Sequence, residues 1–299
     1  MTQEEIAVTS GSPAQRITDN AAYHRHTAVS KSHLDEVARC PQRYWARYLD
    51  PNRVVPEPTP AMVLGSALHT HVLELDQWDA CYAIAPEGLD RRTKDGKAAW
   101  AAFEAEAVNR TVLTRADADL VMAMGRAILG HPAAAMLLNM PGKAETTHMW
   151  TDAATGLECK CRPDWLTDDG RIIVDLKTTE DASPAGFRKS ISSWRYHVQS
   201  AWYLDGLENA TGRRPEQFIF VCVEKKPPHC VAAYAASVEM IEVGALTAET
   251  DLARIAMCRE ANEWPSYSNQ IETIDLPPWM RPRPDGLAQL GTPPEIEMY

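Results

Sequence analysis

Residues 157–177, LECKCRPDWLTDDGRIIVDLK, contain the pattern that decides the fold. Apolar and polar side chains alternate through 157–166, and a mainly apolar run follows at 171–177. Both patterns are typical of β-strands. Asp168-Asp169-Gly170 between them has the composition of a tight turn. We therefore expect an antiparallel hairpin in the middle of the chain.

The second strand of this hairpin carries two charged side chains. Ile173, Asp175 and Lys177 share one face of it because successive strand residues point to opposite sides. A carboxylate and an ammonium in an apolar layer are costly to bury without partners. If the strands pair so that Asp164 lies near Asp175, the two carboxylates favour a Mg²⁺ or Mn²⁺ site, with Lys177 beside it. A structural ion pair between Asp175 and Lys177 is the alternative.

Helical patterns lie on both sides of this strand-rich centre. Serine caps and the spacing of apolar residues predict a helix that begins at Ser30 or Ser32, and Thr59-Pro60 starts another that carries Gly65 and His69 on one face. Further helices are expected at 98–107, 115–129, 193–207 and 239–262, and further strands at 145–151, 217–224 and 231–234. We divide the chain into a flexible tail (1–29), one folded domain (30–276) and a proline-rich tail (277–299).

Composition excludes several classes of protein. The 299 residues are 45% hydrophobic and 24% charged, as in globular domains, and 30 basic against 41 acidic residues give a net charge of −11. A general polycation is excluded, so any contact with DNA must be local or bridged by metal ions. Apolar runs such as 133–138 and 218–223 are too short to span a membrane, and a cytoplasmic location is expected.

The seven cysteines do not form a disulfide or metal framework. Their number is odd and they are scattered. Cys159 and Cys161 alternate on a strand without a second close pair, so we expect no structural zinc. Only Cys258 lies late in the chain, so we expect no iron–sulfur cluster.

Two motifs of the hairpin resemble the signature of the PD-(D/E)xK nuclease superfamily, namely Pro163-Asp164 and Asp175-Leu176-Lys177. Further matches follow in the expected order. Gln199 and Tyr203, four residues apart on the helix expected at 193–207, are similar to the glutamine-and-tyrosine motif of the RecB-like branch.

Segments upstream of the hairpin extend this resemblance. Gly65-Ser66-Ala67-Leu68-His69 resembles the helix whose histidine joins the metal ligands, and 32–45 is similar to the first helix of the RecB-like branch. The basic stretch 91–97 and the overall spacing are similar to phage and prophage nucleases of the exodeoxyribonuclease VIII (RecE) type. The resemblance covers residues 30–262.

The resemblance implies a restriction-endonuclease-like α/β fold, with a central mixed β-sheet flanked by helices and a helical N-terminal part. It implies a Mg²⁺-dependent exodeoxyribonuclease that digests linear double-stranded DNA from 5′ to 3′ in phage-type recombination, with Mn²⁺ as a substitute. The implied metal ligands are His69, Asp164, Asp175 and the carbonyl of Leu176. Lys177 would hold the attacking water or stabilise charge on the phosphate, and Gln199 and Tyr203 would orient Lys177 and the scissile phosphate. Glu145 matches an acidic position of many relatives, and its role stays open.

The expected partners are double-stranded DNA, a single-strand annealing protein and further copies of the chain in a ring, with no membrane. The expected DNA contacts are Arg91, Arg92, Lys94, Lys97 and Arg162, the last on the polar face of its strand. The alternatives are a single-strand nuclease or endonuclease of the same superfamily, and a non-catalytic module that binds DNA or a recombination partner.

Overall fold

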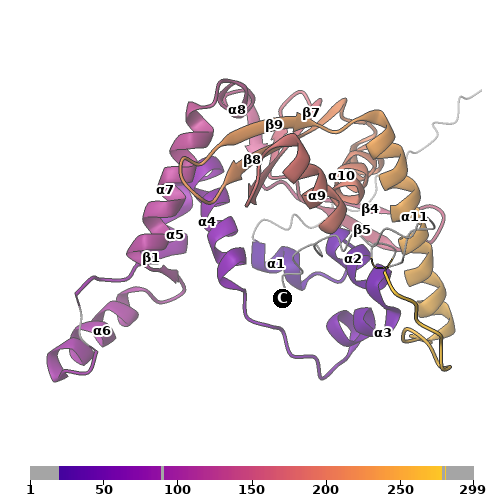
Figure 1. Ribbon diagram of the computed structural model, residues 1–299, viewed down its shortest axis with the longest axis horizontal. Coiled ribbons are helices and arrows are strands. Elements are labelled where there is room, and N and C mark those ends of the chain that lie inside the picture. The colour runs from indigo at the N-terminus through magenta and orange to yellow at the C-terminus, as the bar shows by residue number, and fades with distance from the viewer. Residues whose placement is uncertain (1–19, 89–90, 278–279, 281–299) are drawn as a thin grey trace, which may run out of the picture.

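A five-stranded sheet forms the centre of the computed structural model, which describes residues 20–88, 91–277 and 280 (Figure 1). Its strand order is β3-β6-β7-β8-β9, and only β7 and β8 run parallel. The expectation of a mixed sheet flanked by helices is therefore confirmed. The strands are β3 (Gly142–Ala144), β6 (Trp165–Thr167), β7 (Ile172–Thr179), β8 (Gln217–Glu224) and β9 (Val231–Ala235).

Helices cover both faces of this sheet. Val174 and Leu176 of β7 pack into one core with α4 (Pro60–Leu73), α7 (Arg115–Gly130) and α8 (Pro132–Leu138). Ile173 packs on the opposite face, against α9 (Pro184–Ser193) and α10 (Tyr196–Thr211). Because the side chains alternate, Asp175 and Lys177 also lie on the α10 face.

The strand expected at 157–166 is wrong as a single element. Its first half, β5 (Glu158–Cys161), pairs with β4 (His148–Thr151), whereas its second half is β6 of the central sheet. Pro163 has no N–H to donate and interrupts the strand. The register leaves residues 145–147 facing 162–164 at the point where the chain passes from one sheet to the other.

Tyr23, Ala28 and Val29 are buried, which corrects this part of the flexible tail expected at 1–29. The helix α1 (Asn20–Arg25) precedes Val29, whose N–H donates to Glu158 O (2.8 Å) and whose carbonyl accepts from Lys160 N (2.7 Å). These backbone bonds hold 20–29 against β5. Residues 1–19 lie outside the described part of the chain, as does nearly all of the tail expected at 277–299.

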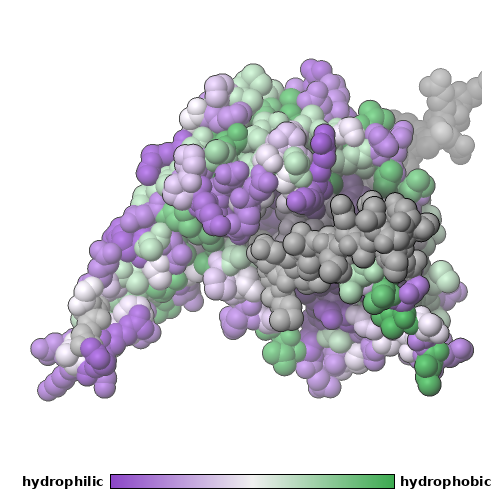
Figure 2. All heavy atoms as spheres, viewed as in Figure 1, coloured by the Kyte–Doolittle hydropathy of each residue, from purple (hydrophilic) through white to green (hydrophobic). Residues whose placement is uncertain are grey.

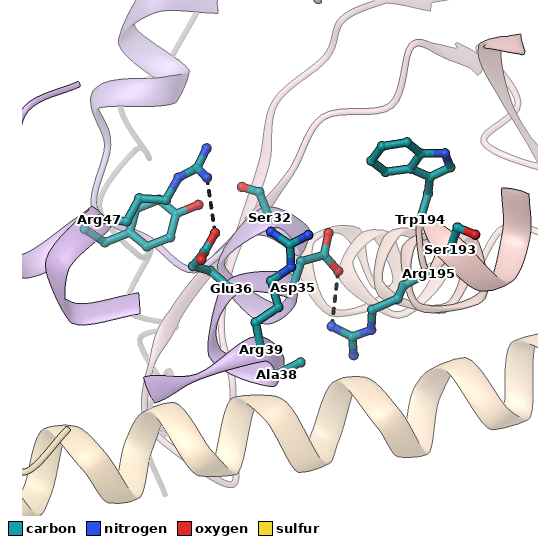
Figure 3. A pocket seen from close by; sticks show the side chains of 10 residues that line it. Ser32, Asp35, Glu36, Ala38, Arg39, Arg47, Ser193, Trp194 and Arg195 are labelled. Carbon is teal, nitrogen blue, oxygen red and sulfur yellow. Dashed lines mark hydrogen bonds and ion pairs between the residues drawn. The ribbon is translucent and has the colours of Figure 1, made fainter. Parts of the chain in front are cut away.

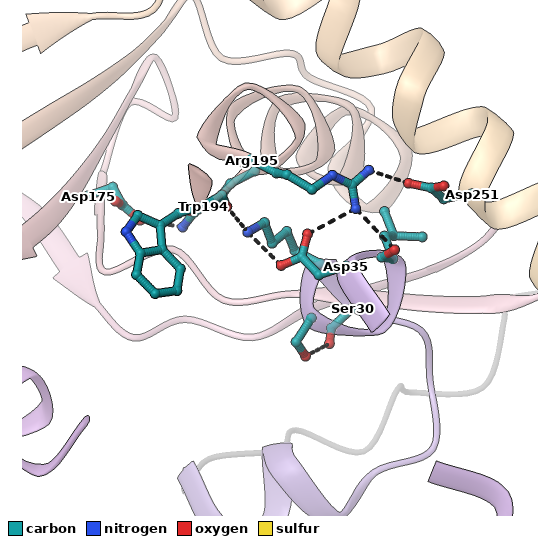
Figure 4. A network of polar contacts seen from close by, with 10 residues as sticks. Ser30, Asp35, Asp175, Trp194, Arg195 and Asp251 are labelled. Atoms are coloured by element: carbon teal, nitrogen blue, oxygen red, sulfur yellow. Dashed lines mark hydrogen bonds and ion pairs between the residues drawn. The ribbon is translucent and has the colours of Figure 1, made fainter. Parts of the chain in front are cut away.

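Two short helical segments and one long helix complete the region around α2 (Lys31–Arg39). They are α3 (Pro41–Tyr44) with the π-helical turn Trp45–Leu49, and α11 (Val238–Ala261). Arg195, which directly precedes α10 with a φ of 53°, ties these elements together (Figure 4). Its guanidinium donates to Leu34 O (3.1 Å) and Asp35 Oδ1 (3.2 Å) on α2 and pairs with Asp251 on α11. This network fixes the start of α10.

An arm projects from the body beyond α7 (Figure 1). It consists of α6 (Lys94–Glu106) and a parallel strand pair, β1 (Tyr82–Ile84) with β2 (Thr111–Leu113), and it follows the short helices Leu75–Gln77 and α5 (Trp78–Cys81). The helix expected at 98–107 begins earlier, because Thr93 Oγ1 accepts from Gly96 N (3.0 Å) as its N-cap. Hydrophilic residues cover the end of the arm (Figure 2).

No single helix in the described residues is long and apolar enough to cross a membrane. Within the described part of the chain, α7 and α8 taken together reach that length and composition, but they are bent by 92° at their junction.

Candidate active site

The candidate site forms where β6 leaves the edge of β7. Trp165, the first residue of β6, pairs with Val174, so the backbone of Leu176 has no strand partner at this edge. Two side chains take the place of the strand. The amide N–H of Leu176 donates to Asp164 Oδ2 (2.7 Å), and its carbonyl accepts from His69 Nε2 (3.1 Å). Satisfying one buried peptide group thus brings α4 and the Pro163-Asp164 turn together on β7.

The other nitrogen of His69 faces two carboxylates. His69 Nδ1 lies 3.6 Å from Asp164 Oδ2 and 3.8 Å from Glu145 Oε1. One potential ligand atom from each of these three residues lies within 4.8 Å of the others. Two carboxylates and an imidazole suit a divalent cation, and the partial exposure of His69 and Glu145 leaves room for water and substrate. These donors fit the divalent metal that the sequence predicts, and its identity as Mg²⁺ or Mn²⁺ stays a prediction.

The electrostatics of this cluster show how strongly its members interact. Burial lowers the pKa of His69, but the Asp164 and Glu145 carboxylates outweigh it and raise that pKa to about 9. Burial raises the pKa of Asp164 to about 7, with a further contribution from Asp175 and an opposing one from His69. Clustered carboxylates with a shared cationic partner are typical of functional sites.

Asp175 and Lys177 form an ion pair beside the cluster. Asp175 is fully buried; its Oδ1 accepts from Gln199 Nε2 (2.5 Å) and its Oδ2 contacts the Lys177 ammonium. The group of three ligand atoms contains Glu145 in place of Asp175, and the Leu176 carbonyl faces His69. Metal ligation by Asp175 and by Leu176 therefore stays a prediction, whereas the structure brings Glu145, whose role the sequence left open, into the cluster.

The α10 helix supplies the polar residues that face β7. Gln199 holds Asp175, as described, and the ring of Tyr203 one turn later packs edge-on against Phe218 (6.0 Å between centroids). Tyr196, which the sequence did not mark as a site residue, has its ring 4.9 Å from the Lys177 ammonium. Its position three residues before Gln199, on the same helical face, was the available signal. The predicted role of Tyr203 in orienting Lys177 and the phosphate is still a prediction.

Arg162, predicted to contact DNA, is buried beside Glu145. Only 9% of it is exposed, and its Nε donates to Glu145 Oε2 (2.9 Å) while Nη1 donates to Thr147 Oγ1 (3.3 Å). The break between β5 and β6 turns the side chain inward to a carboxylate, and DNA binding by Arg162 stays a prediction. An unbroken strand over 157–166 would place Arg162 on the polar face, so the expected alternation did not predict its contact with Glu145.

The other predicted DNA contacts lie on the arm, away from the cluster of His69, Glu145 and Asp164. The guanidinium of Arg91 stacks on the ring of Trp100 (3.2 Å to the centroid), and Lys94 and Lys97 are exposed in the first turn of α6. These side chains therefore do not belong to the candidate metal site of His69, Glu145 and Asp164.

A pocket of about 500 Å³ lies beside α2 (Figure 3). Side chains of α2, the turn after α3 and the α9–α10 junction line it, among them Ser32, Arg39 and Trp194. Lys31 donates to Trp194 O (2.6 Å) and lies 5.9 Å from the Tyr196 ring, which Lys177 also contacts. Lys31 thus contacts both Trp194, which lines the pocket, and the aromatic ring beside the ion pair of β7.

Comparisons with known proteins identify the family and the fold of the chain. A family model described as "PDDEXK-like domain of unknown function (DUF3799)" matches residues 30–277. The crystal structure of a "putative exonuclease" from Eubacterium rectale superposes with a TM-score of 0.62 at 16% identity, over 88% of this chain and 97% of that one. The crystal structure of SSO0001 gives a TM-score of 0.28 at 14% identity, over 64% and 84% of the two chains. No curated protein matches the sequence.

Proposed function

Because the chain belongs to the family of PDDEXK-like domains of unknown function (DUF3799), we propose that it is a divalent-metal-dependent nuclease that hydrolyses DNA phosphodiester bonds. The observation that carries the proposal is the convergence of His69, Glu145 and Asp164 beside the Asp175–Lys177 pair. The fold is that of a PDDEXK-like nuclease, and the superfamily resemblance of the sequence is confirmed. The RecB-like and RecE-type assignments are narrower and stay predictions.

The residues divide the chemistry between them. His69, Glu145 and Asp164 would hold the metal, which supplies a Lewis acid and a more acidic bound water. Gln199 holds Asp175, and the Asp175 carboxylate in turn holds the Lys177 ammonium, which can donate to a phosphate oxygen or orient the attacking water. Burial lowers the pKa of Lys177, but Asp175 and Asp164 raise it well above its ordinary value. The amine therefore stays charged and acts as an electrostatic group, not as a base.

We further propose that the substrate is linear double-stranded DNA, digested from the 5′ end in phage-type recombination with Mg²⁺ or Mn²⁺. The order of motifs in the sequence supports this assignment, as does the fold shared with a protein described as a putative exonuclease. A cytoplasmic location, a ring of identical subunits and a single-strand annealing partner belong to the same proposal. Light scattering of the full-length chain, alone and with linear duplex, tests the ring.

Metal removal is the direct test of the activity. We expect EDTA to abolish release of nucleotides from linear duplex DNA, and excess Mg²⁺ or Mn²⁺ to restore it, because a divalent cation held by His69, Glu145 and Asp164 would make the attacking water more acidic. Duplexes labelled at either end, closed circles and single strands are compared in the same assay. Cutting of closed circles would indicate an endonuclease. Digestion of single strands alone would indicate a single-strand nuclease. DNA retention without cleavage under any divalent metal would reject the nuclease.

The arm is proposed as a contact for the duplex outside the site. Replacing Lys94 and Lys97 with alanine is expected to weaken DNA binding by roughly 10-fold and to lower the slope of log Kd against log salt by about two, because each lysine releases counterions from phosphate. Titration of labelled duplex at several salt concentrations measures both. The double variant Arg171→Ala/Arg213→Ala removes the same charge from the β6–β7 hairpin side and should leave binding unchanged. Equal losses in both variants would contradict a specific role of the arm.

A further inference from the structure

Arg162 is a buried charged residue that the proposed chemistry does not use directly. Its guanidinium spans two acceptors on the opposite side of the strand break, Glu145 Oε2 (2.9 Å) and Thr147 Oγ1 (3.3 Å). A planar fork of donors can satisfy both acceptors at once, which a lysine ammonium on a flexible stem does less well. The contact therefore fixes an orientation as well as a charge.

Glu145 needs such a restraint because it does not lie in regular structure. It follows β3 with a φ of 51°, in the left-handed region that side-chain-bearing residues seldom adopt. Its N–H donates to Asp164 O (3.1 Å), which fixes the backbone, and its Oε1 faces His69 Nδ1. The second oxygen is held by Arg162. The Arg162 guanidinium thus helps to fix the direction in which the Glu145 carboxylate faces His69.

The N-terminal helix α1 covers Arg162 from the other side. The ring of Tyr23 lies 5.6 Å from the Arg162 guanidinium and 4.4 Å from the Lys160 ammonium, and only 8% of Tyr23 is exposed. Lys160, itself buried, donates to Tyr23 O (2.5 Å) and His26 O (2.8 Å). Cations packed on an aromatic face in a water-poor site are stabilised there. Tyr23 precedes the region matched by the family model, residues 30–277.

We propose that Arg162 is a positioning residue for the metal ligand Glu145, and that α1 holds Arg162 in place through Tyr23. The inference rests on the proposed metal-dependent nuclease and adds to it a requirement for a segment outside the family domain. The metal site of this chain is then built in layers: Glu145 contacts the ion, Arg162 directs Glu145, and the ring of Tyr23 excludes water from Arg162. Partners of this kind typically change metal affinity about 10–100-fold.

Mn²⁺ binding to the full-length chain, followed by electron paramagnetic resonance without DNA, tests the proposal independently of activity. We expect Arg162→Gln to weaken Mn²⁺ binding about 10–100-fold and to lower kcat at limiting Mn²⁺, with KM for DNA unchanged. Arg171→Gln, an exposed arginine paired with Glu216, is the matched control and should bind Mn²⁺ as the wild type does. Tyr23→Ala should weaken binding by roughly fivefold, and it carries the test if Arg162→Gln does not fold.

A double-mutant cycle separates positioning from a general structural role. If Arg162 acts through Glu145, then Arg162→Gln should cause no further loss of Mn²⁺ affinity in a Glu145→Gln background. Additive losses would overturn the proposal, as would an Mn²⁺ affinity of folded Arg162→Gln within twofold of wild type. A rise in KM for DNA with intact Mn²⁺ binding would identify Arg162 as a DNA contact and reject it as a positioning residue. Absence of Mn²⁺ binding by the wild type would overturn the proposed function as well, and so distinguishes the two failures.

Discussion

The substitution Asp175→Asn is expected to lower kcat for DNA hydrolysis by roughly 10³-fold or more. Asp175 is fully buried, with one oxygen on Gln199 and the other on the Lys177 ammonium. Asp175→Asn keeps the shape of the side chain but removes the charge that holds Lys177, and it directs either an amide N–H₂ or a neutral oxygen at the ammonium. Initial rates at saturating Mg²⁺ and linear duplex measure the loss, and gel retardation tests whether DNA is still bound.

The matched control for this variant lies on the same hairpin. Asp168 is exposed at the turn between β6 and β7, and Asp168→Asn should hydrolyse DNA at the wild-type rate. Circular dichroism and the thermal midpoint establish that Asp175→Asn is folded. A folded Asp175→Asn protein that keeps more than about a tenth of the wild-type rate would show that the Asp175–Lys177 pair is structural, the alternative that the sequence left open.

Loss of the Arg195 contacts with α2 and α11 is expected to destabilise the folded protein strongly. Arg195→Met should lower the free energy of unfolding by about 3–5 kcal/mol, because the buried carboxylate of Asp251 loses its cation and Leu34 O loses a donor. Burial already raises the pKa of Asp251, and Arg195 opposes that rise. Urea unfolding followed by tryptophan fluorescence measures the change.

A second arginine on the α10 side of the molecule provides the comparison. Arg214 pairs with Asp205 and Glu208 in a partly exposed arrangement, and Arg214→Met should cost less than about 1 kcal/mol. In an Asp251→Asn background, Arg195→Met should cost less than it does alone, since no buried charge remains to be compensated. Equal destabilisation by Arg195→Met and Arg214→Met would contradict the role given to the network that starts α10.

The sequence located the elements whose pattern is local. The strand expected at 217–224 is β8 with the same bounds, and β7 and α10 lie within a few residues of their expected positions. The reason is that an apolar run with β-branched residues, or apolar spacing of three and four, is set by the segment itself. The same alternation placed Asp175 and Lys177 on one face, and the structure shows them in contact.

Tertiary structure alone decided how the site is completed. Pro163 interrupts the strand locally, but the pairing of its two halves with different segments, 148–151 and 142–144, made Arg162 the partner of Glu145. Tyr23 reaches the site from a segment with no hydrophobic period of its own, because Lys160, far along the chain, anchors its carbonyl. The sequence by itself determined the hairpin, the helix that faces it and the residues that could bind a metal. Which of those residues converge was decided by a peptide group of Leu176 left without a strand neighbour, since a buried N–H and C=O must find partners from wherever the fold supplies them.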